Sequence, residues 1–589
     1  MSSNESKNIH SIVGSLFFGE FDEKLIFPFP HFSDAQVEMA KEMTAAIDTF
    51  AKNNINSEKF DQESHIPDEV IAGLGEMGLL GLAVPEELGG LGLDYSLYCR
   101  LFAQVASYDA SVATMIGAHQ SIGYRALINE GTELQKKKWL PLLASGKVIA
   151  SFCLTEPGSG SDAYSIKTKA IDNKDGTYTI NGQKLWITNG GYAGFYSVYC
   201  KTDHQIDGKA VEKISCFIVE KERAGVTFGE KENKMGIRGS ETRAVYFDKV
   251  VVPKENILGE LGQGFKIAMN VLNSGRLSLG AGCVGAMKTT LKLATEHATN
   301  RKQFDRPIAE FGLVQQKLAK MAEMTYAVES IVYLSTGNMI KGMNDYHMET
   351  AVCKVFGSEC LWQTIDMGMQ IAAGNGYMKE YPYERIMRDS RIQLIFEGTN
   401  EILRCLLALS GVRGPSEDMK ELGKISEVSS ALQDPIKSLG VFTKFARKRL
   451  SNMMGSKQMT SAHSELKEQA EKFSSNLGKF AIAVEDSLIK YGKKIVDNEL
   501  PQGRLADMVI DLYVTCAVIS RTTAIMNSSK ATQDQKDYVF RMTKQICKDA
   551  NRRFSKNAAS MSKNSDKTVI KISESVVKFG GYGLDIIDF

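Results

Sequence analysis

The chain has 589 residues, of which 43 % are apolar and 24 % are charged, values that exclude disordered and fibrous proteins. At roughly 150 residues per domain, this length predicts about four domain-sized units. Lys and Arg number 71 and Asp and Glu 70, so the net charge is +1, which argues against a dedicated nucleic-acid binder. The charge is divided unevenly, with about +8 on residues 411–589 and about −7 on residues 1–410.

The ten cysteines are scattered singly, without a CxxC pair or metal-ligand spacing, so we expect reduced core thiols and no metal site. The N-terminus, MSSNESKNIH, has no basic region followed by an apolar run, and no Arg precedes Arg100. We therefore expect neither a signal nor a transit peptide. The sequence contains no run of 18 apolar residues, so we expect no membrane-spanning helix. These features favour a bacterial-like cytoplasmic protein, with the mitochondrial matrix as the alternative.

The first two predicted domains differ in their hydrophobic period. Residues 34–148 repeat apolar positions at helical spacing, which predicts an N-terminal α domain. Residues 149–263 contain short alternating runs and predict a middle β domain. An Asn181-Gly182 pair within the run 177–188 predicts a hairpin turn, and Asp175-Gly176 precedes the same run. Further strands are predicted at 195–201, 215–220 and 243–252.

Helical spacing returns at residue 264 and continues to 410, which predicts a second α domain. The polar segment 411–434, with Pro415 near its start, predicts a loop-like linker. Residues 435–589 are again helical by period and predict an additional helical domain. The sequence thus predicts a mainly α protein with a central β domain.

The segment 152–162, FCLTEPGSGSD, reads as a strand that ends in a glycine-rich turn. Main-chain N–H groups freed by Gly158 and Gly160, together with the Thr155 and Ser161 hydroxyls, could hold a polar ligand such as a pyrophosphate. A plain strand-to-loop turn is the alternative.

Trp186 lies two residues before Thr188, and the chain has only three Trp. Alternate residues of a strand share a face, so an aromatic plane beside a hydroxyl suits a flat heteroaromatic ring. The alternative is that Trp186 belongs to the core.

Glu397 lies between Phe396 and Gly398, in apolar surroundings. A carboxyl in such surroundings has a raised pKa, which suits a general base near neutral pH. Gly398 permits close approach of a ligand. The alternative is an ion-paired residue at a helix start.

In this order and spacing, these segments resemble the acyl-CoA dehydrogenase family. The resemblance covers roughly residues 34–410 and continues into the C-terminal helices. Segments such as 117–123 (GAHQSIG) and 397–400 (EGTN) are most similar to its very-long-chain branch. It is carried by five segments: 155–158 (TEPG), 182–188 (GQKLWIT), 301–304 (RKQF), 370–376 (QIAAGNG) and 396–399 (FEGT).

The resemblance implies an α domain, a β-barrel-like domain and a four-helix-bundle domain, plus the additional helical domain. It implies that FAD is bound and that acyl-CoA is the substrate. It implies a homodimer, because part of the cofactor site lies across a subunit boundary. The cofactor-binding positions implied are Phe152, Leu154, Thr155, Gly160, Ser161, Trp186, Ile187, Thr188, Arg301, Phe304, Phe311, Gly312, Gln370, Ile371, Gly374, Thr399, Asn400 and Glu401. The substrate-binding positions implied are Ser161, Asn273, Arg276, Phe396 and Gly398.

By the same resemblance, Glu397 is the catalytic base of an α,β-dehydrogenation in fatty-acid β-oxidation. It removes the α-proton of the acyl-CoA while the β-hydrogen leaves as hydride to flavin N5, which gives a trans-2-enoyl-CoA. Some branches place the base on an earlier helix, and the matching residue here is Gly275, which cannot serve. The family commonly has two glycines where this chain has Ala373-Gly374, a departure that could crowd the cofactor.

The strip 435–450 (PIKSLGVFTKFARKRL) predicts a basic amphipathic helix that could lie on an anionic membrane. A packed helix with solvated Lys and Arg is the alternative. The resemblance further implies electron transfer to an electron-transferring flavoprotein. Two other functions stay open: an acyl-CoA oxidase that uses O₂, and a scaffold or assembly protein on the same fold.

Overall fold

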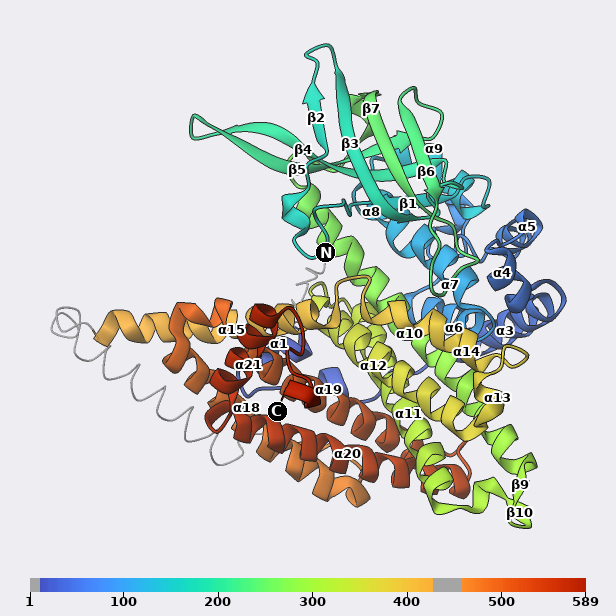
Figure 1. Ribbon diagram of the computed structural model, residues 1–589, viewed down its shortest axis with the longest axis vertical. Coiled ribbons are helices and arrows are strands. Elements are labelled where there is room, and N and C mark those ends of the chain that lie inside the picture. Colours follow the sequence, from blue (N-terminus) through green and yellow to red (C-terminus); the bar gives the residue numbers. More distant parts are fainter. Residues whose placement is uncertain (1–10, 427–457, 589) are drawn as a thin grey trace, which may run out of the picture. The chain divides into compact units, whose positions relative to one another are not determined.

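The computed structural model describes residues 11–426 and 458–588 and divides them between two compact units (Figure 1). Unit 1 comprises residues 24–403 and 520–543, with Ser11. Unit 2 comprises residues 12–23, 404–426, 458–519 and 544–588. Four described helices contribute residues to both units: α2 (Glu23–Ile26), α15 (Asn400–Ser426), α19 (Glu499–Asn527) and α20 (Gln533–Ser562).

The first part of unit 1 is helical, as predicted. Its helices begin where the sequence supplies caps: Ser33 and Gln36 form a capping box at α3, and Asp94 accepts the N–H groups of Ser96 and Leu97 at 2.9 Å, which satisfies otherwise unpaired donors. The elements are α3 (Asp34–Asn54), α4 (Ser57–Glu63), α5 (Asp68–Glu76), α6 (Tyr95–Ala106), α7 (Ala110–Gly117), a π-helix (Ala118–Gly123), α8 (Arg125–Glu130) and α9 (Glu133–Ala144).

A single eight-stranded sheet follows, with the order β6-β7-β3-β2-β4-β5-β8 and β1 parallel to β4. Buried apolar side chains, including Val198, Phe217 and Val245, form its core. The strands are β1 (Ala150–Cys153), β2 (Lys169–Asp172), β3 (Thr177–Thr188), β4 (Phe195–Ile206), β5 (Lys209–Glu220), β6 (Val226–Lys231), β7 (Thr242–Pro253) and β8 (Ile257–Leu258).

The predicted turn at Asn181-Gly182 is wrong. β3 runs through both residues, and Gly182, with φ of +147°, lies at a register shift against β7. Its Cα lies so close to Thr168 that an added Cβ would be 2.5 Å from the Thr168 Oγ1. The glycine therefore marks a bulge with close backbone approach, and the turn between β2 and β3 lies at Asp175-Gly176 instead.

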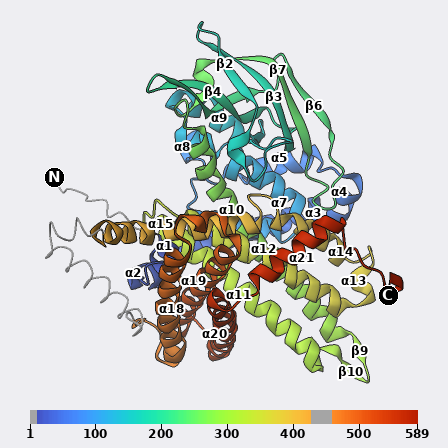
Figure 2. The same ribbon diagram turned by 60° about the vertical axis from the view of Figure 1, so that its left-hand side comes forward.

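The helical part of unit 1 is built around α10 (Gly264–Asn300), which packs on α6, α11 and α12 (Figures 1 and 2). The other elements are β9 (Lys302–Gln303), β10 (Arg306–Pro307), α11 (Gly312–Ile340), α12 (His347–Ala372), α13 (Gly374–Tyr377), α14 (Tyr383–Arg391) and the start of α15. The mainly α architecture with a central β domain is confirmed.

Unit 2 is a helical unit in which α18 (Lys467–Tyr491), α19 and α20 lie side by side (Figure 2). The N-terminal helix α1 (Ile12–Leu16), which the sequence analysis did not predict, packs on α18. The Phe17 and Phe480 rings lie 4.9 Å apart in an edge-to-face contact. Arg404 pairs with Asp507 at 2.7 Å. The remaining helices are α2 (Glu23–Ile26), at the edge between the units, and α21 (Asp566–Phe579).

The prediction of a loop-like linker is wrong for residues 411–426, because α15 continues through Pro415 to Ser426. Two glycines in this stretch of α15 serve packing. A Cβ on Gly411 would lie 2.2 Å from the Phe17 ring, and one on Gly414 would lie 2.3 Å from the Phe18 ring. The rest of the predicted linker and the basic strip 435–450 lie outside the described residues.

All ten cysteines are free thiols, and nine of them are buried, as expected. Among the described residues, no group of three His, Cys, Asp or Glu side chains could hold a metal ion. By length and composition alone, α19 is the one described helix that could cross a membrane, yet 83 % of its most apolar stretch is buried. The burial is that of a core helix.

Candidate functional site

Glu397 lies in the turn between α14 and α15, with a left-handed backbone. Its φ is +62°, and that of the following Gly398 is +93°. A non-glycine residue in this conformation costs free energy and persists only where its surroundings fix it. Two cations do so here: Arg276 Nε donates to the Glu397 carbonyl oxygen at 3.1 Å, and Lys354 Nζ donates to that of Gly398 at 2.8 Å.

The Glu397 carboxyl has an unused oxygen. Oε2 is buried without a hydrogen-bond partner, and the Glu397 N–H has no acceptor among the described residues. Gly275 on α10 supplies the room, because a Cβ there would lie 2.6 Å from Oε2. The position where other branches carry a base is thus the position that makes space for Glu397.

Burial raises the pKa of Glu397 to about 7, although the charges of Arg276 and Lys354 act to lower it. A carboxyl with this pKa is divided between its acid and carboxylate forms at neutral pH, which suits proton abstraction. Burial also lowers the pKa of Lys354 to about 8. The predicted alternative, an ordinary ion pair at a helix start, is excluded, since no cationic nitrogen of the described residues lies within salt-bridge distance of the carboxyl.

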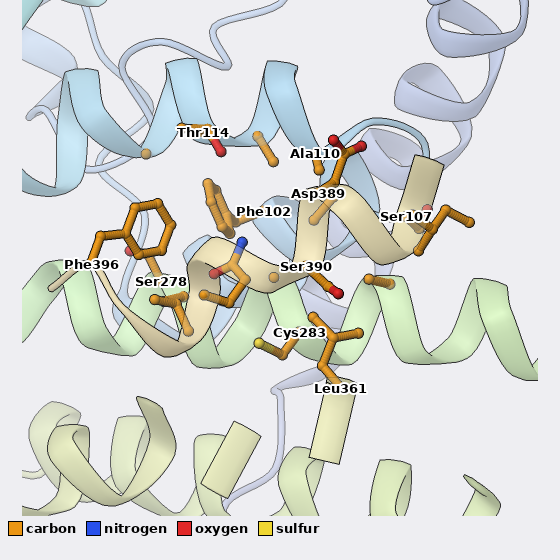
Figure 3. A pocket seen from close by; sticks show the side chains of 18 of the residues that line it. Phe102, Ser107, Ala110, Thr114, Ser278, Cys283, Leu361, Asp389, Ser390 and Phe396 are labelled. Carbon is orange, nitrogen blue, oxygen red and sulfur yellow. The ribbon is translucent and has the colours of Figure 1, made fainter. Parts of the chain in front are cut away.

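Glu397 lines a cavity of about 310 Å³ in unit 1 (Figure 3). Its walls come from α6, α7 with the π-helix, α10, α12 and α14, and Thr188 reaches it from β3. Figure 3 shows Phe396 at one end and Asp389, Leu361 and Ser107 toward the other. Most of the lining is apolar, including Phe102, Ala106, Ala110, Ala113, Gly117, Ile122, Gly275, Leu279, Gly282, Cys283, Ala286, Leu293, Leu361, Ile365 and Ile386.

The cavity is long, because it follows α10 from Gly275 to Leu293. At 1.5 Å per helical residue this face extends about 27 Å. Its remote end contains a second carboxyl, that of Asp389, whose pKa is raised to about 7 by burial and by the nearby Asp109. Arg385, which pairs with Asp109 at 3.9 Å, lines the same end.

The predicted cofactor loop follows β1 and is fixed by a buried ion pair. Lys184 Nζ lies 2.7 Å from Glu156 Oε1 and donates to the Leu154 carbonyl at 3.0 Å. Burial acts to raise the pKa of Glu156, but Lys184 and the hydrogen bonds from Thr168 and Lys167 outweigh it and lower the pKa. Phe152 and Thr155 are partly exposed, whereas Leu154 is buried.

Beyond this ion pair the loop opens to solvent. Ser161 is exposed, and no atom lies within 4 Å of a Cβ placed on Gly158 or Gly160.

Trp186 is 62 % exposed and has φ of +56°, so the core interpretation is excluded. It lies at a second register shift in β3, which sets its indole out of the sheet. Thr188 lines the cavity, but the Ile187 side chain is buried in the core of the sheet. A large exposed aromatic in a strained conformation indicates a surface kept for a ligand.

The other predicted cofactor residues gather elsewhere. Phe304 is 88 % exposed, and its ring lies 6.1 Å from that of Phe311. Ile371 is buried in an apolar cluster with Ile308, which brings the segments 301–312 and 370–374 together. Arg301, Gly312, Gln370 and Gly374 are exposed around this cluster. Figure 1 shows β9 and β10 far from the sheet that carries Trp186.

Three predicted residues follow Glu397. Thr399 Oγ1 accepts the Ile402 N–H at 3.3 Å, and Glu401 is exposed. Asn400 is 2 % exposed, and its side chain bonds Lys354, Ser358 and Glu359. The Asn400 side chain therefore faces α12 and is used within the fold.

Of the predicted substrate-binding residues, four lie together. Arg276 Nη1 donates to Asn273 Oδ1 at 3.1 Å, Arg276 holds Glu397, and Phe396 and Gly398 flank that residue.

The sequence analysis missed the cavity-facing side of α7 and both buried lysines. Lys354 and Lys184 stand at core positions of an apolar helix and a strand, a signal that could have identified them.

Domain-family comparisons match four parts of the chain. Residues 38–147, 151–250 and 262–411 match the acyl-CoA dehydrogenase N-terminal, middle and C-terminal domains, and residues 464–582 match the ACAD9/ACADV C-terminal domain. The chain belongs to the acyl-CoA dehydrogenase family.

Relatives within the family extend the similarity over most of the chain. The very long-chain specific acyl-CoA dehydrogenase, mitochondrial, of Rattus norvegicus is 40 % identical over 97 % of this chain and 88 % of its own length. The Homo sapiens protein of the same name is 42 % identical over 89 % and 80 %. An acyl-CoA dehydrogenase from Bacillus anthracis, solved in complex with FAD, has a TM-score of 0.80 and 34 % identity, covering 96 % of this chain and 94 % of its own.

As a member of this family, the chain is a flavin-dependent oxidoreductase that uses FAD. Its residues fit the cofactor. The exposed indole of Trp186, the cavity-lining Thr188 and the open space above Gly158 and Gly160 form a surface suited to a planar ring with a polar tail. The family carries out acyl-CoA dehydrogenation, so the long apolar cavity that begins at Glu397 is a candidate acyl site.

Proposed function

We propose that this enzyme dehydrogenates long- and very-long-chain acyl-CoA to trans-2-enoyl-CoA in fatty-acid β-oxidation, with Glu397 as the base. The observation that carries the proposal is the buried, unpartnered Oε2 of Glu397 at the cavity wall. This atom is available to accept the α-proton of an acyl group that lies in the cavity. The pKa of about 7 makes the transfer feasible at neutral pH.

The surrounding residues prepare the proton transfer. Gly275 leaves room for the carboxyl, and Arg276 and Lys354 fix the main chain on either side of it. The Glu397 N–H, which has no acceptor among the described residues, is free to donate to the thioester oxygen and stabilise its developing charge. When bound, FAD supplies the acceptor for the hydride that leaves the β-carbon.

Replacing Glu397 with Gln tests the base. We expect turnover to fall by about 10³-fold or more, within the range for a lost general base. Absorbance of bound FAD and the affinity for acyl-CoA should stay near the wild-type values, because the amide has the same shape. The measurement is anaerobic single-turnover reduction by palmitoyl-CoA.

The matched control is Glu380→Gln, which removes an exposed carboxylate from the loop before α14 and should leave turnover unchanged. Turnover of the Glu397→Gln enzyme within tenfold of wild type would sink the assignment of the base.

The length of the cavity supports a preference for long acyl chains. One lipid tail occupies about half of the roughly 30 Å hydrocarbon thickness of a bilayer. The cavity wall along α10, at about 27 Å, is longer than that half-thickness. We expect kcat/KM to rise from C4 to C16 acyl-CoA and to stay high at C20. A maximum at C4 to C8 would contradict this preference.

For the electron acceptor we propose an electron-transferring flavoprotein. Structural relatives include a chain in the electron transferring flavoprotein structure from Acidaminococcus fermentans, with a TM-score of 0.61, but also the prolyl acyl carrier protein oxidase AnaB, with a TM-score of 0.60. Anaerobic turnover with the flavoprotein supports the dehydrogenase, whereas turnover that needs O₂ and releases peroxide supports an oxidase.

A homodimer is proposed because one chain does not bring its two groups of predicted cofactor residues together. Phe304 and Tyr377, 88 % and 82 % exposed, leave apolar surface suited to a second copy. Sedimentation velocity of the FAD-loaded enzyme should give twice the chain mass. A monomer that keeps full FAD content would contradict the proposal.

The basic strip 435–450 is proposed as a contact with anionic membrane surfaces. Binding to vesicles containing anionic lipid should weaken steeply with salt, and no binding at low salt would exclude it. The names of the mammalian relatives favour the mitochondrial alternative over the cytoplasm. Cell fractionation against matrix and cytosolic markers distinguishes the two.

A further inference from the structure

Lys354 is a buried lysine without an acidic partner at salt-bridge distance among the described residues. It lies inside α12 and is 0 % exposed. It donates hydrogen bonds to two neutral oxygens, the Gly398 carbonyl at 2.8 Å and Asn400 Oδ1 at 2.7 Å. Burying an ammonium group is costly unless the site uses it, and both acceptors belong to the segment that carries Glu397.

The two hydrogen bonds fix Lys354 at the strained turn. Glu397 and Gly398 both have positive φ, and their carbonyl oxygens are bonded to Arg276 from α10 and to Lys354 from α12. Successive main-chain oxygens are thus held by cations from two different helices. Such duplicate fixing is what a strained turn needs if it is to keep one geometry.

Asn400 connects this turn to α12 a second time. Its Oδ1 accepts from Lys354, while its Nδ2 donates to Ser358 Oγ and Glu359 Oε1, both at 3.1 Å. The ammonium therefore has a defined position relative to the turn, rather than the freedom of a surface lysine. Helix α12 therefore fixes the side from which the Lys354 ammonium acts on the turn.

The charges around Glu397 are few. Arg276 of α10 and Lys354 of α12 are the groups that act on it, and both favour its carboxylate form. Lys354 is itself influenced by Glu397, by Cys283 and Arg276 of α10 and by Glu359 of α12. In a buried site each charge acts strongly, so removing one of the two cations should change the balance between acid and carboxylate.

We propose that Lys354 is a positioning residue for Glu397: its ammonium holds the left-handed turn and its charge keeps the carboxyl ionised. The inference rests on the proposed role of Glu397 as base. Lys354 touches neither the acyl cavity nor the reacting atoms, and it acts through the Gly398 carbonyl and through space. Arg276 performs the matching task from the other side.

Two variants of the full-length holoenzyme test the proposal. Lys354→Met removes the donor and the charge, and Lys354→Gln keeps an N–H donor but removes the charge. We expect the midpoint of the pH profile of kcat to move up by about one pH unit in both, as for a carboxyl that loses a nearby cation. At pH 7 the ionised fraction of Glu397 then falls from about one half to about one eleventh, which lowers kcat about fivefold, with KM for palmitoyl-CoA nearly unchanged.

A direct readout accompanies the kinetics. Infrared difference spectra identify the protonated Glu397 carboxyl as the band that is missing in Glu397→Gln. The pH at which this band disappears should rise in both Lys354 variants. The control is Lys288→Met. Lys288 is a cation of α10 that pairs with Glu329 of α11, and its removal should keep the wild-type midpoint.

The outcomes separate the inference from the proposed function. If Glu397→Gln keeps its turnover, Glu397 is not the base and the proposed function fails. If that variant is inactive while both Lys354 variants keep the wild-type kinetic and infrared midpoints, only the inference is overturned. A merely structural lysine would lower the melting temperature without moving either midpoint, and Lys354→Gln decides the case if Lys354→Met does not fold.

Discussion

Two carboxyls line the same cavity with the same pKa of about 7, yet their surroundings differ. Burial raises the pKa of both Glu397 and Asp389. Asp389 Oδ1 accepts the Ile237 N–H, and Arg385 and Asp109 stand beside it. Oε2 of Glu397 has no partner among the described residues, and Gly275 leaves space beside it.

The difference teaches that a raised pKa does not by itself identify a base. Desolvation acts on any buried carboxyl, whether it supports the fold or the reaction. What distinguishes Glu397 is a free oxygen, room for a reacting group and a main chain fixed by two cations. Asp389 is bonded within the fold, so it should contribute to stability rather than to proton transfer.

After the loss of the Glu397 carboxyl itself, the largest expected effect comes from removing the room around it. In Gly275→Ala, the new Cβ would lie 2.6 Å from Glu397 Oε2, and the flexible carboxyl must move while the helix stays intact. A displacement of about 1 Å can cost about 10²-fold in rate. We expect kcat to fall by about that factor for acyl chains of every length, measured with FAD content unchanged.

The matched control is Gly503→Ala in α19, where no atom lies within 4 Å of the added Cβ. Alanine is the better helix former, so this variant should be at least as stable and fully active. An unimpaired Gly275→Ala enzyme would remove the distinction between the two carboxyls, because space at Glu397 would then not matter.

A smaller effect should follow from blocking the cavity between its two ends. Gly282 lines the cavity on α10, seven residues after Gly275, and a Cβ there would lie 3.2 Å from the Phe102 ring. In Gly282→Val, kcat/KM for palmitoyl-CoA should fall by about 10- to 100-fold, in line with the 1–3 kcal/mol that one methylene contributes in an apolar pocket.

Butyryl-CoA is the internal control, since a short acyl group ends before this point and should keep its kcat/KM. Equal losses for the two substrates would mean that the cavity beyond Gly282 does not hold the acyl chain. Asp389 would then lie outside the acyl site, and the comparison would reduce to Glu397 alone.

Local patterns allowed the sequence to predict much of the fold, since alternation and helical spacing placed the sheet and the helices. The apolar neighbours of Glu397 made it a candidate base, and the resemblance to the family selected it as the base that we propose. Two signals misled. Asn181-Gly182 suggested a turn, and the polar segment 411–434 with Pro415 suggested a loop, whereas Gly182 and Gly411 permit close packing against distant residues, Thr168 and Phe17. Such contacts between remote segments leave no local pattern.

The same limit applies to the site. The exposure of Trp186 depends on a register shift in β3, which strand alternation does not anticipate. The role of Lys354 depends on a carbonyl 44 residues away in sequence. The cavity itself is built by helices from separate parts of the chain, so sequence patterns could not predict its length.

The smallest effect on activity is expected at Asp389, where the effect on stability should be clear. Its pKa is about 7 in the folded state, against an ordinary value of 3.8 for an aspartate, so the folded state holds the proton that the unfolded state releases. Stability from this group is present at low pH and is lost as pH rises toward 7, at about 1.4 kcal/mol per pH unit for one proton.

Asp389→Asn cannot titrate and should remove that slope between pH 5 and 6 in urea unfolding. Its amide oxygen can still accept the Ile237 N–H, so turnover should stay within about threefold of wild type, as for an ordinary conservative change. A loss of turnover as large as that of Glu397→Gln would show that both carboxyls serve the reaction.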